Sequence, residues 1–157
     1  SFTLGLQGPC LTIDTACSSS LVAMNSAIQS IREGERSELA IAAGVNLMLA
    51  PEPMIQMCQA SMLSPTGRCH TFDAAADGYT RGEGFGAVVL EPKTKAIEKG
   101  HRLLALVAGA AVNQDGASSG LTVPNANAQV SLIRQALFKA GLQPDAIDYI
   151  EAHGTGT

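Results

Sequence analysis

The sequence predicts an α/β fold, because apolar runs typical of strands alternate with segments whose apolar residues recur at helical spacing. The longest apolar run, Leu103–Val112, is typical of a buried strand. A helix is expected over Ala126–Ala140, with Gly141 as its stop signal. Its apolar face is formed by Val130, Ile133, Leu137 and Ala140. Ile147–Ile150 is a second expected strand, so this strand–helix–strand order predicts a parallel pair with a right-handed crossover.

The composition is that of one ordinary domain of 157 residues with enough apolar content to build a core. Charged residues make up 15% of the chain, which argues against disorder. The formal net charge of −4 gives no general reason to expect nucleic-acid binding. No apolar run approaches the roughly 20 residues that a membrane-spanning helix needs.

The cysteines show no CxxC spacing, so we expect no metal site. They are Cys10, Cys17, Cys58 and Cys69. A disulfide framework is not expected in so apolar a chain, and a cytoplasmic location fits best.

Cys17 is the most informative residue, because it lies at a corner between an expected strand, Cys10–Ile13, and an expected helix. The serines Ser18–Ser20 favour a helix start, and apolar residues follow at helical spacing: Leu21, Met24, Ile28 and Ile31. Backbone N–H groups at a helix N-terminus stabilise negative charge, and the thiolate is the nucleophilic form of cysteine. The same groups can hold a developing oxyanion. An inert, buried cysteine is the alternative interpretation.

His153 follows the expected strand Ile147–Ile150, at the end of a strand where α/β sheets gather catalytic groups. Gly154 and Gly156 beside it allow close backbone approach by a substrate. A strand-end cysteine and a strand-end histidine form a plausible pair of nucleophile and acid/base or hydrogen-bond donor. A structural histidine is the alternative.

The middle of the chain, from Ala50 to Gly84, is expected to be mostly loop, and long loops in compact domains are usually functional. Gly82–Gly86 is not a dinucleotide fingerprint, because it precedes a strand instead of following one. Four charged residues here are expected to form a buried ion network, and a catalytic carboxylate group is the alternative: Asp73, Asp77, Arg81 and Glu83.

Two further clusters favour structural interpretations. Four methionines are expected to fill gaps in the core, with an acyl tunnel as the alternative: Met48, Met54, Met57 and Met62. Arg32–Arg36 is expected to be a solvated helix end.

Four blocks of the chain resemble the β-ketoacyl synthase (ketosynthase) domain of modular type I polyketide synthases, in the family's order. Asp14–Leu21 is similar to its nucleophile motif. Ser64–Cys69 with Phe72–Gly84 is similar to its long mid-domain signature, and Val112–Gly116 with Gly120–Asn125 to a third block. Glu151–Thr157 is similar to the block with the first active-site histidine. One such motif would be weak, whereas four in order are specific.

The resemblance implies a thiolase-like, layered αβαβα fold, of which this chain is the incomplete central part. Residues 1 to about 100 would end the N-terminal half, and residues from about 101 to 157 would begin the C-terminal half. In the first half, Leu11–Ile13, Leu39–Val45 and Phe85–Leu90 would be strands. We expect the chain alone to be inactive and poorly folded.

The reaction implied by the resemblance is a decarboxylating Claisen condensation in polyketide chain elongation. Cys17 would carry the acyl chain as a thioester, and His153 would stabilise the enolate of a malonyl-type extender. Thr155 and Thr157 would contact the pantetheine arm. No directly bound cofactor is implied, since phosphopantetheine arrives on the acyl carrier protein. A homodimer through Leu11–Thr15 is also implied, with an isologous interface.

Several alternatives stay open. A non-elongating ketosynthase, acting in acyl transfer or as a scaffold, would lack a second histidine that the family carries beyond Thr157. A fatty-acid synthase ketosynthase is a close relative. A papain-like protease also places its Cys before its His, but its local Cys signature is missing. A thiolase would share the fold, although Ser64–Gly84 does not suit it.

Overall fold

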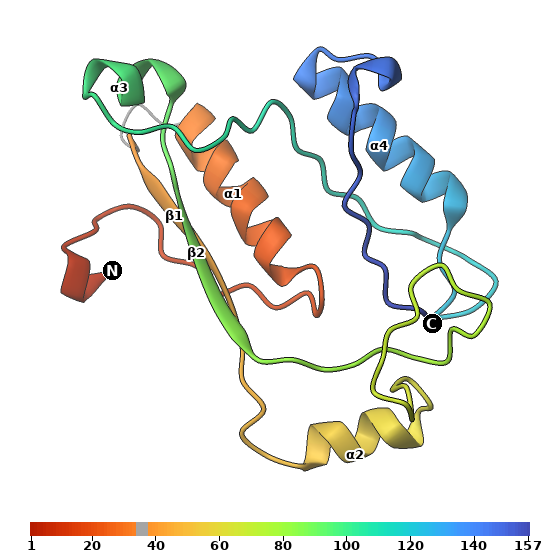
Figure 1. Cartoon of the computed structure of the whole chain (residues 1–157). Helices are drawn as coiled ribbons and strands as arrows, with labels where there is room; N and C mark the ends of the chain where they lie inside the picture. Colours follow the sequence, from red (N-terminus) through yellow and green to blue (C-terminus); the bar gives the residue numbers. More distant parts are fainter. Residues whose placement is uncertain (34–37) are drawn as a thin grey trace. The chain divides into compact units, whose positions relative to one another are not determined.

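The computed structural model describes residues 1–33 and 38–157. The elements, in chain order, are η1 (Phe2–Leu4), α1 (Ser19–Glu33), β1 (Ala40–Asn46), α2 (Glu52–Gln59), β2 (Gly84–Leu90), α3 (Lys93–Glu98), α4 (Ala126–Ala140) and η2 (Pro144–Ala146) (Figure 1). The chain divides into two compact units, each built from two separate stretches. The first unit is Ser1–Gly44 with Ala87–Asp148, and the second is Val45–Gly86 with Tyr149–Thr157.

The helices α1 and α4 form where the apolar spacing predicts them. In α1 the expected apolar face includes Ile28, which is buried. In α4 the side-chain oxygen of Asn125 accepts hydrogen bonds from the N–H groups of Asn127 and Ala128, which caps the helix N-terminus. Gly141 ends α4 with a φ of 68°, a left-handed conformation that glycine adopts without strain. The predicted helix Ala126–Ala140 and its stop signal are therefore confirmed.

The strands β1 and β2 pair in a two-stranded sheet and agree with the predicted strands within one residue at each end. Helix α1 lies beside these strands (Figure 1). Gly44 of β1 explains how closely they approach, because a Cβ atom there would lie 2.8 Å from the Cβ of Ser20. A residue larger than glycine at position 44 would push the helix away from the strand.

Three predicted strands are wrong within the described part of the chain. Leu11–Ile13, Leu103–Val112 and Ile147–Ile150 have no ladder partners there, so the predicted parallel pair is not formed. Hydropathy predicts that a segment favours an extended, apolar setting, but a strand also requires a neighbour to accept its hydrogen bonds. Residues 103–112 instead approach α4 through Gly109, where a Cβ would lie 2.6 Å from the carbonyl oxygen of Ala136.

The segment Ala50–Gly84 is mostly loop, as expected, and its first part contains α2. Pro53 occupies the first turn of this helix and Glu52 lies beside it, an arrangement typical of a helix N-terminus. Pro53 therefore marks a helix start here. The expected solvated helix end is described only to Glu33, where α1 ends, and residues 34–36 lie outside the described residues.

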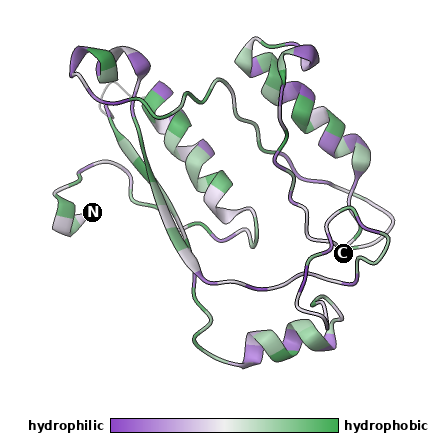
Figure 2. Ribbon diagram, viewed as in Figure 1, coloured by the Kyte–Doolittle hydropathy of each residue, from purple (hydrophilic) through white to green (hydrophobic). Residues whose placement is uncertain are grey.

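Apolar and polar residues alternate along the helices (Figure 2). Few of the apolar side chains are buried. Among the described residues, the buried apolar side chains are Ile28, Ala42 and Ala96. Phe138 of α4 is 85% exposed. Leu104, within a predicted buried strand, is 83% exposed. Within the described ranges, no helix has the length and apolar character to cross a membrane.

Candidate functional site

A network of short side-chain hydrogen bonds builds the corner that carries Cys17. The Asp14 carboxylate accepts a hydrogen bond from the N–H of Ala16 at 3.0 Å. The N–H of Thr15 donates to the hydroxyl of Ser19 at 2.9 Å, and that hydroxyl donates to the carbonyl of Ala16 at 2.6 Å. The side chains of Asp14 and Ser19 thus bond the backbone locally, and these bonds turn the chain sharply into α1.

Ala16 makes the turn at this corner sharp, because its φ of 59° lies in the left-handed region. A non-glycine residue pays about 1–2 kcal/mol of steric strain there. Cys17 follows directly and is exposed, two residues before the first residue of α1. Burial of the Cys17 thiol, one part of the alternative interpretation, is therefore wrong in this structure.

An open groove of about 730 Å³ lies in the same unit as Cys17. One wall is lined by Thr15, Ser18 and Val22, and the other by residues 112–118 and 120–121 with Val123. The carboxylate and carbonyl oxygens of Asp115 fix this second wall, because they accept hydrogen bonds from the N–H and side-chain amide of Asn125. The third family-like block therefore faces the residues that flank the cysteine.

His153 belongs to the second unit, in a loop held by the segment 69–79. The hydroxyl of Thr71 donates to the carbonyl oxygen of Gly154 at 2.5 Å. The N–H of Gly78 donates to the carbonyl oxygen of Gly156 at 3.0 Å. Gly154 and Gly156 both have positive φ, 59° and 71°. The His153 side chain is exposed and makes no hydrogen bond with the described residues. The loop backbone is thus fixed while the imidazole stays open to a substrate.

Thr155 and Thr157 bring two hydroxyl groups to the same place, 2.8 Å apart. Thr155 is half-buried and Thr157 is exposed. A hydroxyl both donates and accepts, so the pair can bind an amide N–H and an amide carbonyl at once. The structure places Cys17 in one unit and His153, Thr155 and Thr157 in the other.

The predicted buried ion network is wrong for the described residues. Asp73 and Glu83 bond backbone N–H groups, those of Ala75 (2.8 Å) and Met48 (2.5 Å). The guanidinium of Arg81 donates to the sulfur of Met57 at 2.6 Å. The ion pairs of the described ranges involve Lys95, Lys99 and His101 with Glu98, Glu38 and Glu91. The carboxylates of Asp73 and Glu83 thus bond backbone N–H groups, and the Arg81 guanidinium bonds a sulfur atom, so these charges do not pair with one another.

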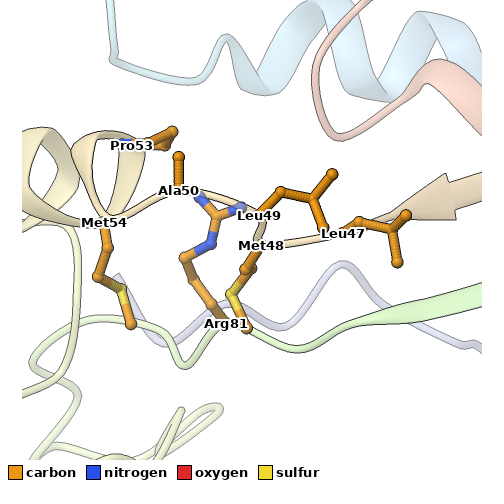
Figure 3. A pocket seen from close by; sticks show the side chains of 7 residues that line it. All are labelled: Leu47, Met48, Leu49, Ala50, Pro53, Met54 and Arg81. Carbon is orange, nitrogen blue, oxygen red and sulfur yellow. The ribbon is translucent and has the colours of Figure 1, made fainter.

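Three of the four methionines do not fill a core, whereas Met57 is half-buried. Met48, Met54 and Met62 are 38–44% exposed. Met48 and Met54 line a hollow of about 40 Å³ with Leu47, Leu49, Ala50, Pro53 and Arg81 (Figure 3). That volume is close to the roughly 30 Å³ share of a single water molecule, so it does not support the tunnel alternative either. All four cysteines are free, and the described residues contain no cluster of three or more ligand side chains suited to a metal ion.

The sequence missed the residues that support the His153 loop. Thr71 and Gly78 lie in the mid-domain block, but periodicity gives no signal for a hydroxyl that bonds a backbone 83 residues away. Gly78 has a φ of 134°, and a Cβ there would lie 2.5 Å from the nitrogen of Ser64. In the sequence, the one indication that another backbone segment lies close to this position was the glycine itself, Gly78, between two polar residues.

Comparison with known proteins gives consistent results over the whole chain. Residues 1–96 match the family "Beta-ketoacyl synthase, N-terminal domain", and residues 104–157 match "Beta-ketoacyl synthase, C-terminal domain". Over its full length, the chain is 56% and 54% identical to two different subunits of the phenolphthiocerol/phthiocerol polyketide synthase of Mycobacterium tuberculosis. It spans 7% and 10% of the lengths of these relatives, respectively.

Solved structures agree with the sequence relatives. The ketosynthase from module 6 of the bacillaene synthase of Bacillus subtilis 168 superimposes with a TM-score of 0.95 at 42% identity. An oxazolomycin ketosynthase domain of Streptomyces albus superimposes with a TM-score of 0.96 at 45% identity. Each comparison covers 99% of this chain and 28% of the other. The chain therefore has the thiolase-like, layered αβαβα fold of these domains and corresponds to part of one such domain.

Proposed function

The chain belongs to the β-ketoacyl synthase family, and on that premise we propose that it is the catalytic centre of a ketosynthase that elongates polyketide chains. The reaction is a decarboxylating Claisen condensation between an acyl thioester and a malonyl-type extender. The two Mycobacterium relatives described above belong to a polyketide synthase, which favours a polyketide role over a fatty-acid role.

Cys17 is the nucleophile in this proposal, and its exposed position at a strained corner is the observation that carries it. The thiolate attacks the carbonyl carbon of an acyl thioester, and the pantetheine thiolate of the acyl carrier protein leaves as the new thioester forms. The N–H of Cys17 lies at the N-terminal end of α1, where it is available to the oxyanion of the tetrahedral intermediate. The groove beside Thr15 and Ser18 gives the acyl chain an approach to this point.

His153 acts in the second step by donating a hydrogen bond to the thioester carbonyl of the extender. Loss of CO₂ leaves an electron pair on the α-carbon, so negative charge develops on that carbonyl oxygen as an enolate forms. The enolate carbon then attacks the Cys17 thioester, and the Cys17 thiolate leaves. The open imidazole on a fixed backbone suits this role, because the donor must meet a substrate atom without reorganising.

Thr155 and Thr157 bind the pantetheine arm that carries each substrate. The arm contains amide groups, and the two hydroxyls 2.8 Å apart can bond its N–H and carbonyl groups. The phosphopantetheine belongs to the substrate, since it is attached to the acyl carrier protein. This chemistry needs no directly bound cofactor.

The remaining proposals concern assembly. Residues 1 to about 100 end the N-terminal half of the ketosynthase, and residues from about 101 to 157 begin its C-terminal half. The extended segment Leu11–Thr15 pairs with the same segment of a second copy, which makes the interface isologous. The acyl carrier protein docks twice in each cycle, once to load Cys17 and once to deliver the extender. Four free cysteines fit a reducing compartment such as the cytoplasm.

The test is acyl loading on the intact ketosynthase domain that contains this chain. Wild type, Cys17→Ala and His153→Ala receive an acyl-pantetheine thioester, and the covalent mass is followed before extender is added. We expect acylation to be lost only in Cys17→Ala and condensation to be lost in both variants. Acylation of wild type without condensation would indicate a non-elongating domain. No acylation at all would refute the catalytic assignment of Cys17.

A further inference from the structure

The segment 69–79 holds the His153 loop through contacts that the proposed roles of Cys17, His153 and the threonines do not use. Thr71 and Gly78 each bond one carbonyl of the loop, those of Gly154 and Gly156. The two contacts are two residues apart on the loop, so together they fix both the position and the orientation of its backbone. We call them the loop clamp.

The loop needs a clamp because glycine is the residue that loses most conformational freedom on folding. Gly154 and Gly156 flank Thr155, and both adopt positive φ. Without external hydrogen bonds, rotation about these two residues would move His153 and both threonine hydroxyls. The backbone preference of the loop itself therefore does not keep His153 in one place.

One side of the clamp is rigid. The N–H of Tyr79 donates to Met62 O at 3.1 Å, and the N–H of Ser64 donates to Tyr79 O at 3.0 Å, which forms a short parallel bridge next to Gly78. The backbone at Gly78 packs so closely on this bridge that a Cβ there would lie 2.5 Å from the Ser64 nitrogen. Gly156 is even more crowded, because a Cβ there would overlap the carbonyl oxygen of Cys69.

The other side of the clamp is a single side chain. The Thr71 hydroxyl donates to Gly154 O, one residue from His153. Its methyl carbon also contacts the loop, since a Cβ on Gly154 would lie 3.0 Å from Thr71 Cγ2. The clamp thus consists of two hydrogen bonds. The bond at Gly156 comes from the backbone, and the bond at Gly154 comes from a side chain that substitution can change. Thr71 is the part of it that substitution can remove without altering the backbone.

We propose that Thr71 is a positioning residue, which sets the place of the His153 imidazole through its hydrogen bond to Gly154. The inference rests on the proposed function, in which His153 acts in the condensation step and not in the loading of Cys17. A displacement of about 1 Å is enough to lower the rate of a step that depends on geometry by roughly 100-fold. Thr71 therefore affects condensation while it leaves acylation of Cys17 unchanged.

The test uses three variants of the intact ketosynthase domain. Thr71→Val keeps the size and the methyl contact but removes the donor, and Thr71→Ser keeps the donor but removes the methyl. Thr80→Val is the matched control, because the Thr80 hydroxyl makes no hydrogen bond with the described residues. Acylation of Cys17 is followed by mass, and condensation by single-turnover product formation on the pre-acylated enzyme.

We expect Thr71→Val to slow condensation about 10-fold, the equivalent of one hydrogen bond at the upper end of its usual range. The acylation rate of Thr71→Val should stay within about twofold of wild type. Thr71→Ser, which keeps the donor, should condense at close to the wild-type rate. Condensation by Thr71→Val at the wild-type rate would overturn the proposal. A parallel loss of acylation and condensation would overturn it too, because it would show a general structural effect.

A second readout separates this inference from the proposed function. Hydrogen exchange of the Gly78 N–H reports the bond to Gly156 whether or not the enzyme condenses. Faster exchange in Thr71→Val, with no change in Thr80→Val, supports the clamp. If wild type acylates but does not condense, the proposed function fails and this exchange alone decides the inference. Unchanged exchange would then refute it.

Discussion

Ala16 adopts a backbone conformation that favours glycine, and the proposed nucleophile follows it directly. The hydrogen bonds of Asp14, Thr15 and Ser19 hold the chain in this conformation. Strained residues persist only where their surroundings determine them, and they cluster at functional sites. The strain at position 16 thus turns Cys17 toward solvent at the start of a helix.

Substitutions of Ala16 should separate strain from side-chain loss. In the intact domain, we expect Ala16→Val to lower the free energy of unfolding by about 1–2 kcal/mol more than Ala16→Gly, because a β-branched residue tolerates positive φ poorly. Urea unfolding measures this difference, and acyl loading of Cys17 should fall only in Ala16→Val. Equal stabilities for the two variants would show that the corner relaxes and that Ala16 is not held in place.

Glu91 should make the stability depend on acid pH. Hydrogen bonds first from Lys99 (2.8 Å) and then from His101 (2.7 Å) hold the pKa of Glu91 below its ordinary value of 4.5. A carboxyl with a lowered pKa stabilises the folded state above its unfolded pKa, and this contribution is lost as the pH falls through the folded value. We expect the free energy of unfolding of the intact domain to fall below pH 4.5.

The variant Glu91→Gln should weaken this dependence, since an amide does not titrate. Unfolding midpoints measured from about pH 7 down to about pH 3 provide the comparison. Glu52→Gln is the control, because Glu52 lies in the first turn of α2 and has no ion pair among the described residues. A pH dependence equal in wild type and Glu91→Gln would assign the acid sensitivity to other carboxyl groups.

Glycines set the distances between elements. Gly109 lets residues 103–112 approach α4, and Gly141 ends that helix. The two positions differ in kind, since a Cβ at position 109 meets the backbone of Ala136 and Ala140, whereas nothing lies within 4 Å of a Cβ at position 141. Gly109 is therefore required for space and Gly141 for its backbone conformation.

This difference predicts unequal costs of alanine substitution in the intact domain. Gly141→Ala should destabilise by about 1 kcal/mol, the cost of a left-handed alanine. Gly109→Ala should cost about 3 kcal/mol, the upper end of the usual range for overpacking, because its neighbours are backbone atoms. Urea unfolding of the two variants provides the comparison. A smaller effect for Gly109→Ala would show that residues 103–112 do not pack closely on α4.

Local signals predicted the elements that depend on local interactions. Helix α4 follows from its apolar spacing and Gly141, and the corner before α1 follows from Cys17 and the serines after it. The strand at Leu103–Val112 was wrong because pairing depends on a partner far away in the sequence. The clamp on the His153 loop was missed for the same reason, since Thr71 and Gly154 are 83 residues apart.

At the scale of the whole molecule, the chain exposes far more surface than a stable domain of its size. Its accessible area is 12335 Å², against about 7,500 Å² expected for a folded monomer of 16.2 kDa. Large side chains such as Phe72 and Phe138 are at least 85% exposed. The solved ketosynthases are more than three times as long, and their additional residues are available to cover such surfaces.

The isolated 157-residue chain should therefore lack a cooperative unfolding transition and should not condense substrates. Urea titration followed by circular dichroism tests the first point, and the loading assay with extender tests the second. The intact domain measured under the same conditions is the control. A single cooperative transition in the isolated chain would show that the exposed apolar side chains find partners within these residues.

The interleaving of the two units has a consequence for the order of events during synthesis. Residues 45–86 leave the ribosome before the last nine residues that complete the second unit. At about 5–20 residues per second, the segment that contains Thr71 waits several seconds for the His153 loop. During this interval Thr71 and Gly78 lack their partners Gly154 and Gly156, so the nascent chain completes the contacts of the His153 loop late.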